Sequence, residues 1–256
     1  MDFTPQKYRE LVETLLGHGY QSITYADYCQ MRQDGVELPE RFVILRHDVD
    51  LHAKRSAVIA KIEAAAGAKA VYYFRVIPES NQPDVINEIA GLGHEIGYHY
   101  EDMTICNGDD VQAFSHFCKQ LGYFRKFYPV KTICMHGSPR SQYDAKDLWK
   151  SHSFSSLQII GEPYLTTDFE DVFYLTDTGR CWDGAKFSVR DKVEQPFNLS
   201  FHTTDEIIRT INENKLPQHL MITTHPQRWI DAKGAWVIEW VKQNLKNQIK
   251  RIIIKQ

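Results

Sequence analysis

Two aspartates, Asp48 and Asp50, follow an apolar stretch that has the pattern of a buried strand. Residues 42–45 are an unbroken run of strand-forming side chains, typical of a strand that is buried on both faces of a parallel sheet. Because side chains alternate along a strand, both carboxylates point to the same side. Two carboxylates placed in this way repel each other unless a cation or a shared proton relieves them. The pattern favours a metal site or an acid/base site over the alternative, in which Asp50 caps a helix that begins near His52.

Three further predicted strands also end in ionisable side chains. The first carries His99, Glu101 and Asp102, the second His136, and the last His225. The carboxyl ends of parallel strands lie on one face, so these groups are expected to come together. Imidazole and carboxylate are the ligands of zinc and other divalent transition metals, and they are also the usual acid and base of hydrolysis. A lone histidine at a strand end is commonly structural, but four such ends indicate a functional site.

The elements that position these side chains alternate along the chain. Strands are predicted at residues 42–45, 71–77, 95–100, 131–136, 157–160, 172–176 and 220–225. Helices are predicted at residues 4–16, 52–66, 84–92, 108–126, 203–211 and 236–249, with a loop or short helix before residue 40. This alternation predicts one α/β domain with a mainly parallel sheet, most simply a (β/α) barrel. Residues 1–40 are expected to form a helical extension packed on a barrel of residues 41–256.

The composition excludes several classes of protein. The 256 residues are 43% hydrophobic and 25% charged, with a net charge of -3, so nucleic acid or an anionic membrane is not expected as a partner. No apolar run is long enough to cross a membrane, and no basic segment precedes an apolar one at the N-terminus. The five cysteines lack any C-x-x-C spacing and are most simply buried thiols. We therefore expect a cytoplasmic protein without stable membrane insertion.

The order of the motifs resembles that of the polysaccharide deacetylases, the NodB-homology or carbohydrate esterase family 4 group. The resemblance is strongest to their bacterial branch associated with surface-polysaccharide biosynthesis. It rests on Arg-His-Asp-Val-Asp at residues 46–50, Tyr-Tyr-Phe-Arg at 72–75, Gly-His-Glu-Ile-Gly-Tyr-His at 93–99 and Thr-His-Pro at 224–226. It implies a distorted (β/α) barrel of the NodB type and a metal-dependent hydrolase that removes acetyl groups from amino sugars.

The resemblance also implies roles for four residues. Asp48 matches the aspartate that acts as the general base, and Asp50 matches the aspartate that binds the metal. His99 matches the first histidine of an H-x-x-x-H motif, which is a second metal ligand. His225 matches the histidine that acts as the general acid.

The sequence departs from the family pattern at three places. Val49 separates the two aspartates, which are usually adjacent, and residues 135–140 replace an Arg-Pro motif. The second histidine of H-x-x-x-H falls at Met103, whose thioether is a poor ligand for a hard divalent metal. His136 and Glu101 are the candidates for the third protein ligand.

Four more residues are candidates for substrate binding or for tuning the site. Arg46 and Arg140 are each able to lie near Asp48 and keep it ionised, because an adjacent positive charge lowers the pKa of a carboxylate. Trp182 and Asp183 are candidates for a sugar-stacking ring and for a carboxylate that tunes the general acid, with a plain surface turn as the alternative.

The function implied is removal of an N-acetyl group from an amino sugar, a nucleotide sugar or a glycan, with one divalent metal, expected to be zinc. The alternative is a non-catalytic sugar-binding module that has lost its metal together with the second histidine. The presence of bound metal distinguishes the two.

Overall fold

The computed structural model describes residues 1–138, 141–183, 193–231, 234 and 236–237. Within these residues seven strands form one sheet in the order β5-β4-β3-β2-β7-β6, with β1 also paired to β2. Every pairing between them is parallel. The strands are β1 (Gln21–Ser22), β2 (Phe42–Val49), β3 (Ala70–Phe74), β4 (Glu95–Tyr100), β5 (Ile133–Met135), β6 (Phe173–Thr176) and β7 (His219–Thr224).

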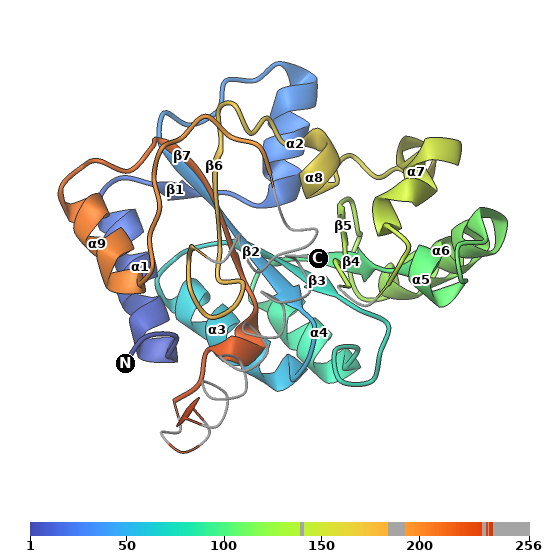
Figure 1. Ribbon diagram of the computed structural model, residues 1–256, viewed down its shortest axis with the longest axis horizontal. Coiled ribbons are helices and arrows are strands. Elements are labelled where there is room, and N and C mark those ends of the chain that lie inside the picture. Colours follow the sequence, from blue (N-terminus) through green and yellow to red (C-terminus); the bar gives the residue numbers. More distant parts are fainter. Residues whose placement is uncertain (139–140, 184–192, 232–233, 235, 238–256) are drawn as a thin grey trace.

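The sheet is strongly twisted and curls around its centre (Figure 1). The expected α/β class with parallel strands is confirmed. Among the described strands none joins the two edges, β5 and β6, so the sheet is a curled half-barrel rather than a closed barrel. Its carboxyl-terminal edge gathers the ends of β2, β4, β5 and β7, the four strands that carry the candidate site residues.

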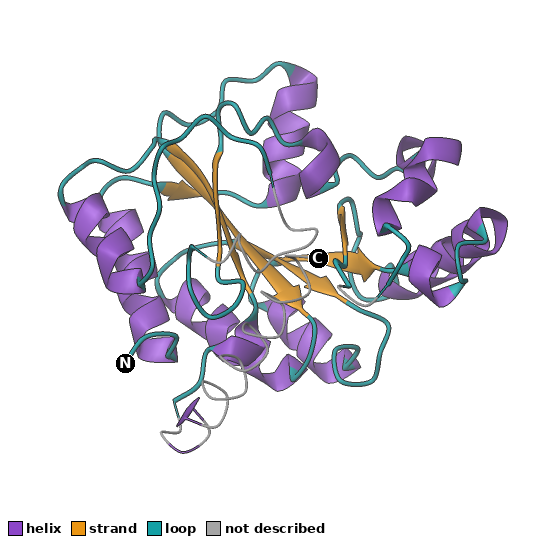
Figure 2. Ribbon diagram, viewed as in Figure 1, coloured by secondary structure: helices purple, strands orange, loops and turns teal. Residues whose placement is uncertain are grey.

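Helices cover both faces of this sheet (Figure 2). They are α1 (Pro5–Gly17), α2 (Tyr25–Asp34), α3 (Ala53–Ala65), α4 (Pro83–Gly91), α5 (Asp102–Ile105), α6 (Asp110–Phe124), α7 (Leu148–Ser151), α8 (Pro163–Thr166) and α9 (Thr204–Asn212), with short 3₁₀ turns η1 (Ala145–Asp147), η2 (Phe154–Leu157) and η4 (Pro226–Arg228). Local signals set several of these starts. Thr4 caps α1 ahead of Pro5, and Thr203 with Glu206 forms the predicted capping box of α9.

Most of the predicted elements are present. The predicted strand at 157–160 is wrong, because Leu157 ends the turn η2 and residues 158–160 form no strand; the isolated bridge nearby joins Thr132 to Gly161. The strand β1 was not expected within residues 1–40, where a loop or short helix was predicted and the helix α2 is found. Asp50 does not cap α3, whose N-cap is His52 in a left-handed conformation without a side-chain hydrogen bond. The predicted helix at 236–249 lies almost entirely outside the described residues.

Alternate residues of β2 belong to two different cores. Val43 and Leu45 pack with α1, α3, α4, α6 and α9 on the outer face of the sheet. Phe42 and Ile44 pack on the inner face with aromatic residues of α2. Arg46 and Asp48 lie on the same inner face, farther along β2. The buried charged side chains therefore lie next to a small apolar core.

The residue between Arg46 and Asp48 points to the outer face. His47 contacts Thr224 Oγ1 through Nδ1 at 2.7 Å and Glu63 Oε1 through Nε2 at 2.7 Å. The hydroxyls of Tyr8 and Tyr72 also donate to the Glu63 carboxylate, each at 2.5 Å. This buried cluster joins α1, α3 and three adjacent strands, and it gives His47 a structural role away from Asp48.

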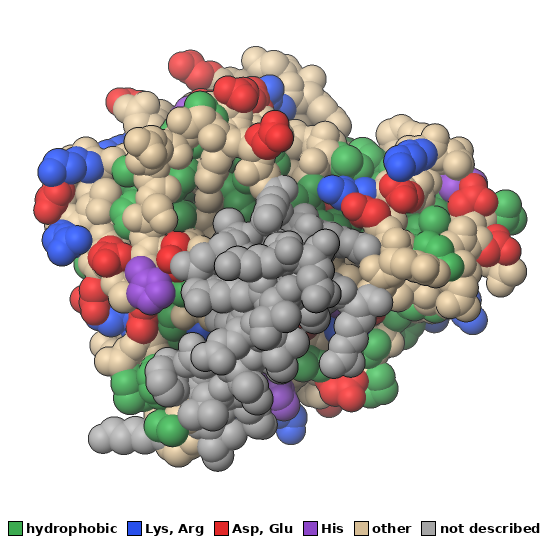
Figure 3. Space-filling model, viewed as in Figure 1, with side chains coloured by type: hydrophobic (Ala, Val, Ile, Leu, Met, Phe, Trp, Pro, Cys, Tyr) green, Lys and Arg blue, Asp and Glu red, His purple; other side chains and the backbone are tan. Residues whose placement is uncertain are grey.

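Acidic and basic side chains are interspersed on the visible face of the described residues (Figure 3). No helix among these residues is both long and apolar enough to cross a membrane.

A buried carboxyl group predicts a specific dependence of stability on pH. Burial raises the pKa of Glu95 to about 7, although Thr132 and the backbone N–H of Ala26 donate hydrogen bonds to it. The folded state therefore binds this proton more tightly than the unfolded state, whose pKa is about 4.5. The contribution of Glu95 is complete below pH 4.5 and is lost as the pH rises to about 7, a change of about 3 kcal/mol in the free energy of unfolding.

We expect Glu95→Gln to remove this dependence, because the amide is neutral at every pH and still accepts from Ala26 and donates to Thr132. Urea unfolding at pH 4.5, 6 and 8 should show the variant gaining stability relative to wild type as the pH rises. Glu13→Gln, at an exposed position, is the control. Parallel curves for wild type and Glu95→Gln would contradict the assignment.

Candidate functional site

Arg46 and Asp48 form a buried ion pair on the inner face of β2. Arg46 donates from Nε to Asp48 Oδ1 at 2.9 Å and from Nη2 to Oδ2 at 2.7 Å. The guanidinium also lies over the ring of Tyr164, 4.7 Å from its centre, and donates to its hydroxyl. Burial alone would raise the pKa of Asp48, but Arg46, with smaller contributions from His99 and His225, holds it below its usual value. Asp48 is therefore an ionised carboxylate.

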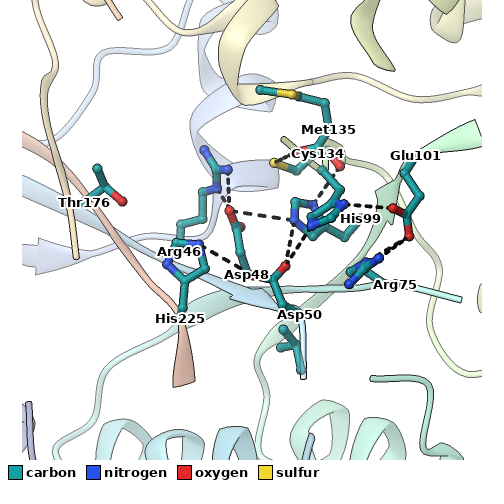
Figure 4. Close-up of polar contacts among 12 residues, drawn as sticks. Arg46, Asp48, Asp50, Arg75, His99, Glu101, Cys134, Met135, Thr176 and His225 are labelled. Carbon is teal, nitrogen blue, oxygen red and sulfur yellow. Dashed lines mark hydrogen bonds and ion pairs between the residues drawn. The ribbon is translucent and has the colours of Figure 1, made fainter. Parts of the chain in front are cut away.

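Asp50 lies just beyond β2, where the imidazoles of three other strand ends converge on it. His99 Nε2 is 3.5 Å and His136 Nε2 is 3.6 Å from Asp50 Oδ1, and His225 Nε2 is 3.9 Å from Oδ2. Figure 4 shows Asp48, Asp50 and His99 pointing toward one another from β2 and β4. The expected convergence of strand ends thus brings these four residues together, with Asp48 Oδ2 at 3.9 Å from His99 Nε2.

In each of the three imidazoles the other ring nitrogen already has a partner. His99 Nδ1 lies 3.0 Å from the carbonyl oxygen of Cys134. His136 Nδ1 lies 2.9 Å from Glu101 Oε2, and His225 Nδ1 lies 2.6 Å from an oxygen of Asp177. These oxygens only accept, so each Nδ1 carries a proton and donates it. When His99 and His136 are neutral, their Nε2 lone pairs therefore face Asp50, as in metal-binding histidines, whereas a protonated His225 presents an N–H from Nε2.

The two distances to Asp50 Oδ1 are compatible with a shared divalent metal ion. Asp50 Oδ1 is buried and has no hydrogen-bond partner among the described residues. Its distances from His99 and His136 exceed the 2.7–2.9 Å of a charge-assisted hydrogen bond. They are close to the separation of about 3 to 3.5 Å between two ligands that each bind one zinc ion at about 2.0–2.2 Å. Lone pairs facing a carboxylate repel it unless a cation lies between them.

A second group of potential ligands shares His99. One ligand atom each of Asp48, His99 and Cys134 lies within 4.8 Å of the other two. Asp48 is already held by both arms of Arg46, whose positive charge would repel a cation bound to the same carboxylate. The Cys134 thiol donates to the carbonyl oxygen of Met135. We therefore favour the group around Asp50, whose Oδ1 has no competing partner within the described chain.

Glu101 orients a histidine instead of facing Asp50. One of its oxygens accepts from His136, and the other accepts from Arg75 Nε at 2.9 Å and Nη2 at 2.6 Å. Burial would raise the pKa of Glu101, but His136 and Arg75 lower it to about 2. Of the two candidates for a third ligand, His136 is thus the one directed at Asp50. Met103 is buried in the outer core, away from this role.

The carboxylate that faces His225 is Asp177, which the sequence analysis missed. Asp177 directly follows β6 and accepts from the backbone N–H of His225, from Arg228 and from Trp229 as well as from the imidazole. Burial would raise the pKa of Asp177, but Arg228 and His225 lower it to about 2. Burial and Arg228 act to lower the pKa of His225, but Asp177 and Asp50 outweigh them and raise it. The signal was available, because Asp177 ends a predicted strand as the other site residues do.

Trp182 and Asp183 do not have the contacts that were expected of them, and Arg140 lies outside the described residues. Trp182 is only 4% exposed, lies beside Phe3 and donates from Nε1 to Thr204, so its ring does not offer a free stacking face. Asp183 contacts the ring of His202 at 3.0 Å and not His225. Both expectations are corrected. Arg140 lies outside the described residues, and Arg46 fills the position beside Asp48.

Because Arg46 and Asp48 form a buried pair, we expect the single substitution Arg46→Met to lower the free energy of unfolding far more than the double substitution does. Arg46→Met leaves a buried carboxylate without its counter-charge and should lower the free energy of unfolding by about 3–5 kcal/mol. Combining it with Asp48→Asn removes both charges and should restore most of this loss. Urea unfolding of the wild type, both single variants and the double variant measures the coupling. Additive losses would mean that the two side chains do not act as a pair.

Neither a family model nor a curated protein matches the sequence, whereas several solved structures are similar to the chain. The deacetylase PplD of Streptococcus pyogenes, solved with acetate, is 12% identical with a TM-score of 0.41, and the match covers 54% of this chain and 65% of PplD. BA3943 of Bacillus anthracis, a CE4 family pseudoenzyme, is 11% identical with a TM-score of 0.43, and the match covers 83% of this chain and 63% of BA3943.

The Xyl-CE4 domain of a xylanase from the hindgut metagenome of Trinervitermes trinervoides is 13% identical with a TM-score of 0.40, and the match covers 82% of this chain and 85% of that domain. The chain thus spans just under two thirds of the length of PplD and BA3943. Of these three proteins, one is a deacetylase and two are CE4 family proteins.

Proposed function

We propose that this protein is a metal-dependent hydrolase that removes the N-acetyl group from an amino sugar. The observation that carries the proposal is the convergence of three Nε2 atoms on the Asp50 carboxylate, whose Oδ1 lacks a partner among the described residues. In this proposal Asp50, His99 and His136 hold one divalent metal, with zinc as the best match to a carboxylate and two imidazoles. When bound, such a metal lowers the pKa of a water to about 7 and polarises a carbonyl oxygen.

Asp48 is the proposed general base. Its carboxylate is kept ionised by Arg46 and its Oδ2 lies 3.9 Å from His99 Nε2, so it is able to accept a proton from a water that attacks beside the metal ligands. Because both oxygens of Asp48 also accept from Arg46, the carboxylate is fixed in orientation before substrate arrives.

His225 is the proposed general acid. Asp177 fixes its Nδ1, which leaves Nε2 directed at the side of Asp50 opposite to His99 and His136. Asp177 and Asp50 raise the pKa of this ring, which favours the protonated form that donates to the departing amine. Both proposed proton-transfer groups lie beside the proposed metal ligands, Asp48 next to His99 and His225 next to Asp50.

The proposed substrate is an N-acetylated sugar, nucleotide sugar or glycan of the cytoplasm, with a role in surface-polysaccharide biosynthesis. The order of the sequence motifs supports this class, and the thiol state of all five cysteines agrees with a reducing compartment. The competing function is a sugar-binding module without a metal. The intact set of paired imidazoles favours the enzyme, because a module without metal has no need to orient three Nε2 atoms on one carboxylate.

The ligand set predicts which substitutions remove the metal. Asp50→Asn and His136→Ala should each lower zinc affinity by at least about 100-fold, since even residues that only orient ligands contribute 10–100-fold. Cys134→Ser should retain zinc, because the thiol is not a ligand in this arrangement. Elemental analysis of the purified variants measures the metal directly. Loss of zinc in Cys134→Ser with retention in Asp50→Asn would show that the metal is bound by Asp48, His99 and Cys134 instead.

The proposed acid and base predict loss of activity without loss of metal. Asp48→Asn and His225→Ala should each reduce acetate release by 10²–10⁴-fold while the bound zinc is retained. For His225→Ala the loss should be greatest with poor amine leaving groups. The double variant Arg46→Met/Asp48→Asn leaves no buried charge unpaired and serves as the control for folding.

These variants are compared with the wild type on a panel of N-acetylated sugars and nucleotide sugars, with metal content and acetate measured on the same samples. A wild type that holds metal but releases no acetate from any of them would exclude deacetylation. A wild type without metal after zinc loading would favour the binding module.

A further inference from the structure

Gln227 is the only described residue outside the imidazole set that contacts the carboxylate of Asp50 by a side-chain hydrogen bond. Its Nε2 donates to Asp50 Oδ2 at 3.1 Å. The amide has to present its NH₂ group here, because its oxygen would repel the carboxylate. With Oδ2 occupied by this donor, Oδ1 remains the oxygen that faces His99 and His136.

The backbone holds Gln227 in place from both sides. Its carbonyl oxygen accepts from Arg55 Nη1 at 2.5 Å, which connects it to α3. Its neighbour Arg228 donates to Asp177, the carboxylate that also fixes His225. The side chain of Gln227 is therefore presented to Asp50 from an anchored turn, η4, and not from a free loop.

The other end of the same amide is unsatisfied. Gln227 Oε1 is buried and has no hydrogen-bond partner within the described residues. A buried acceptor without a donor lowers the stability of the folded protein. Packing alone does not explain a glutamine at this position, since an apolar side chain of the same length would avoid the unsatisfied oxygen. The donor at Nε2 is the feature that distinguishes glutamine from such a side chain.

We propose that Gln227 is a positioning residue that orients Asp50 for metal binding, and that its buried unsatisfied oxygen lowers the stability of the metal-free protein. This inference rests on the proposed metal site. It goes beyond that site by assigning to Gln227 opposite effects on metal affinity and on the stability of the metal-free fold. Substitution of a residue with a purely structural role would lower stability without lowering metal affinity.

Gln195 offers a matched control. Its amide accepts from the backbone N–H of Tyr174 at 2.8 Å and donates to the carbonyl oxygen of the same residue at 3.2 Å, so both ends are satisfied by the edge of β6. Gln195→Met should lower stability and leave metal affinity unchanged. Gln227→Met should do the reverse, with zinc affinity reduced 10–100-fold and the stability of the metal-free protein equal to or above that of the wild type.

The full chain is loaded with zinc and titrated against a chelating dye to give the zinc affinity, and the chelated protein is unfolded in urea. Gln227→Ala serves as a second variant that also lacks the donor and should lose affinity to the same extent. If both Gln227 variants bind zinc as tightly as the wild type, the role of Gln227 is wrong but the proposed function is not affected. The inference would also be wrong if both Gln227 variants lost as much stability as Gln195→Met. Failure of the wild type to bind zinc would overturn the proposed function and this inference with it.

Discussion

An ionised carboxylate buried on the inner face of a parallel sheet is the constraint on which this structure depends. Asp48 is only 3% exposed, and the cost of removing its charge from water has to be offset within the protein. Arg46 supplies the counter-charge from the same strand, two residues earlier, where strand geometry places it on the same face. The ring of Tyr164 covers the guanidinium in turn. The buried polar contacts inside the half-barrel thus depend on the pair of Arg46 and Asp48 on β2.

The same logic extends to the strand ends around Asp50. Each imidazole is paired at Nδ1 with an acceptor from a neighbouring strand or its following loop, and this fixes the direction of Nε2. Glu101 is itself held by Arg75 from the adjacent strand end. The arrangement needs no bound ligand to define it, because the acceptors belong to the sheet. If this site holds the proposed cation, binding does not carry the cost of ordering the ligands.

Much of the fold was predictable from local patterns, and the reasons are visible in β2. Its apolar run and its alternation predicted a buried strand with two carboxylates on one side, and the capping box of α9 was evident from two residues. Long-range relations were not predictable in this way. Glu101 and His136 both directly follow strands, so their sequence positions are equivalent, and only the pairing with Arg75 distinguishes them. Asp177 meets His225 because β6 pairs with β7, a relation that no local pattern encodes.

The cluster of His47 and Glu63 has a consequence for how β2 finds its place in the sheet. Residues 42–45 are apolar on both faces, so their burial alone would tolerate a shift of the strand by one residue relative to β3 and β7. Consecutive residues of β2 place ionisable groups on opposite faces: Arg46 donates to the hydroxyl of Tyr164 on the inner face, and His47 contacts Glu63 on the outer face. A one-residue slip would bury the imidazole of His47 against the inner core and direct Asp48 at the carboxylate of Glu63. Strand register is therefore fixed by electrostatic pairing where the hydrophobic pattern is ambiguous.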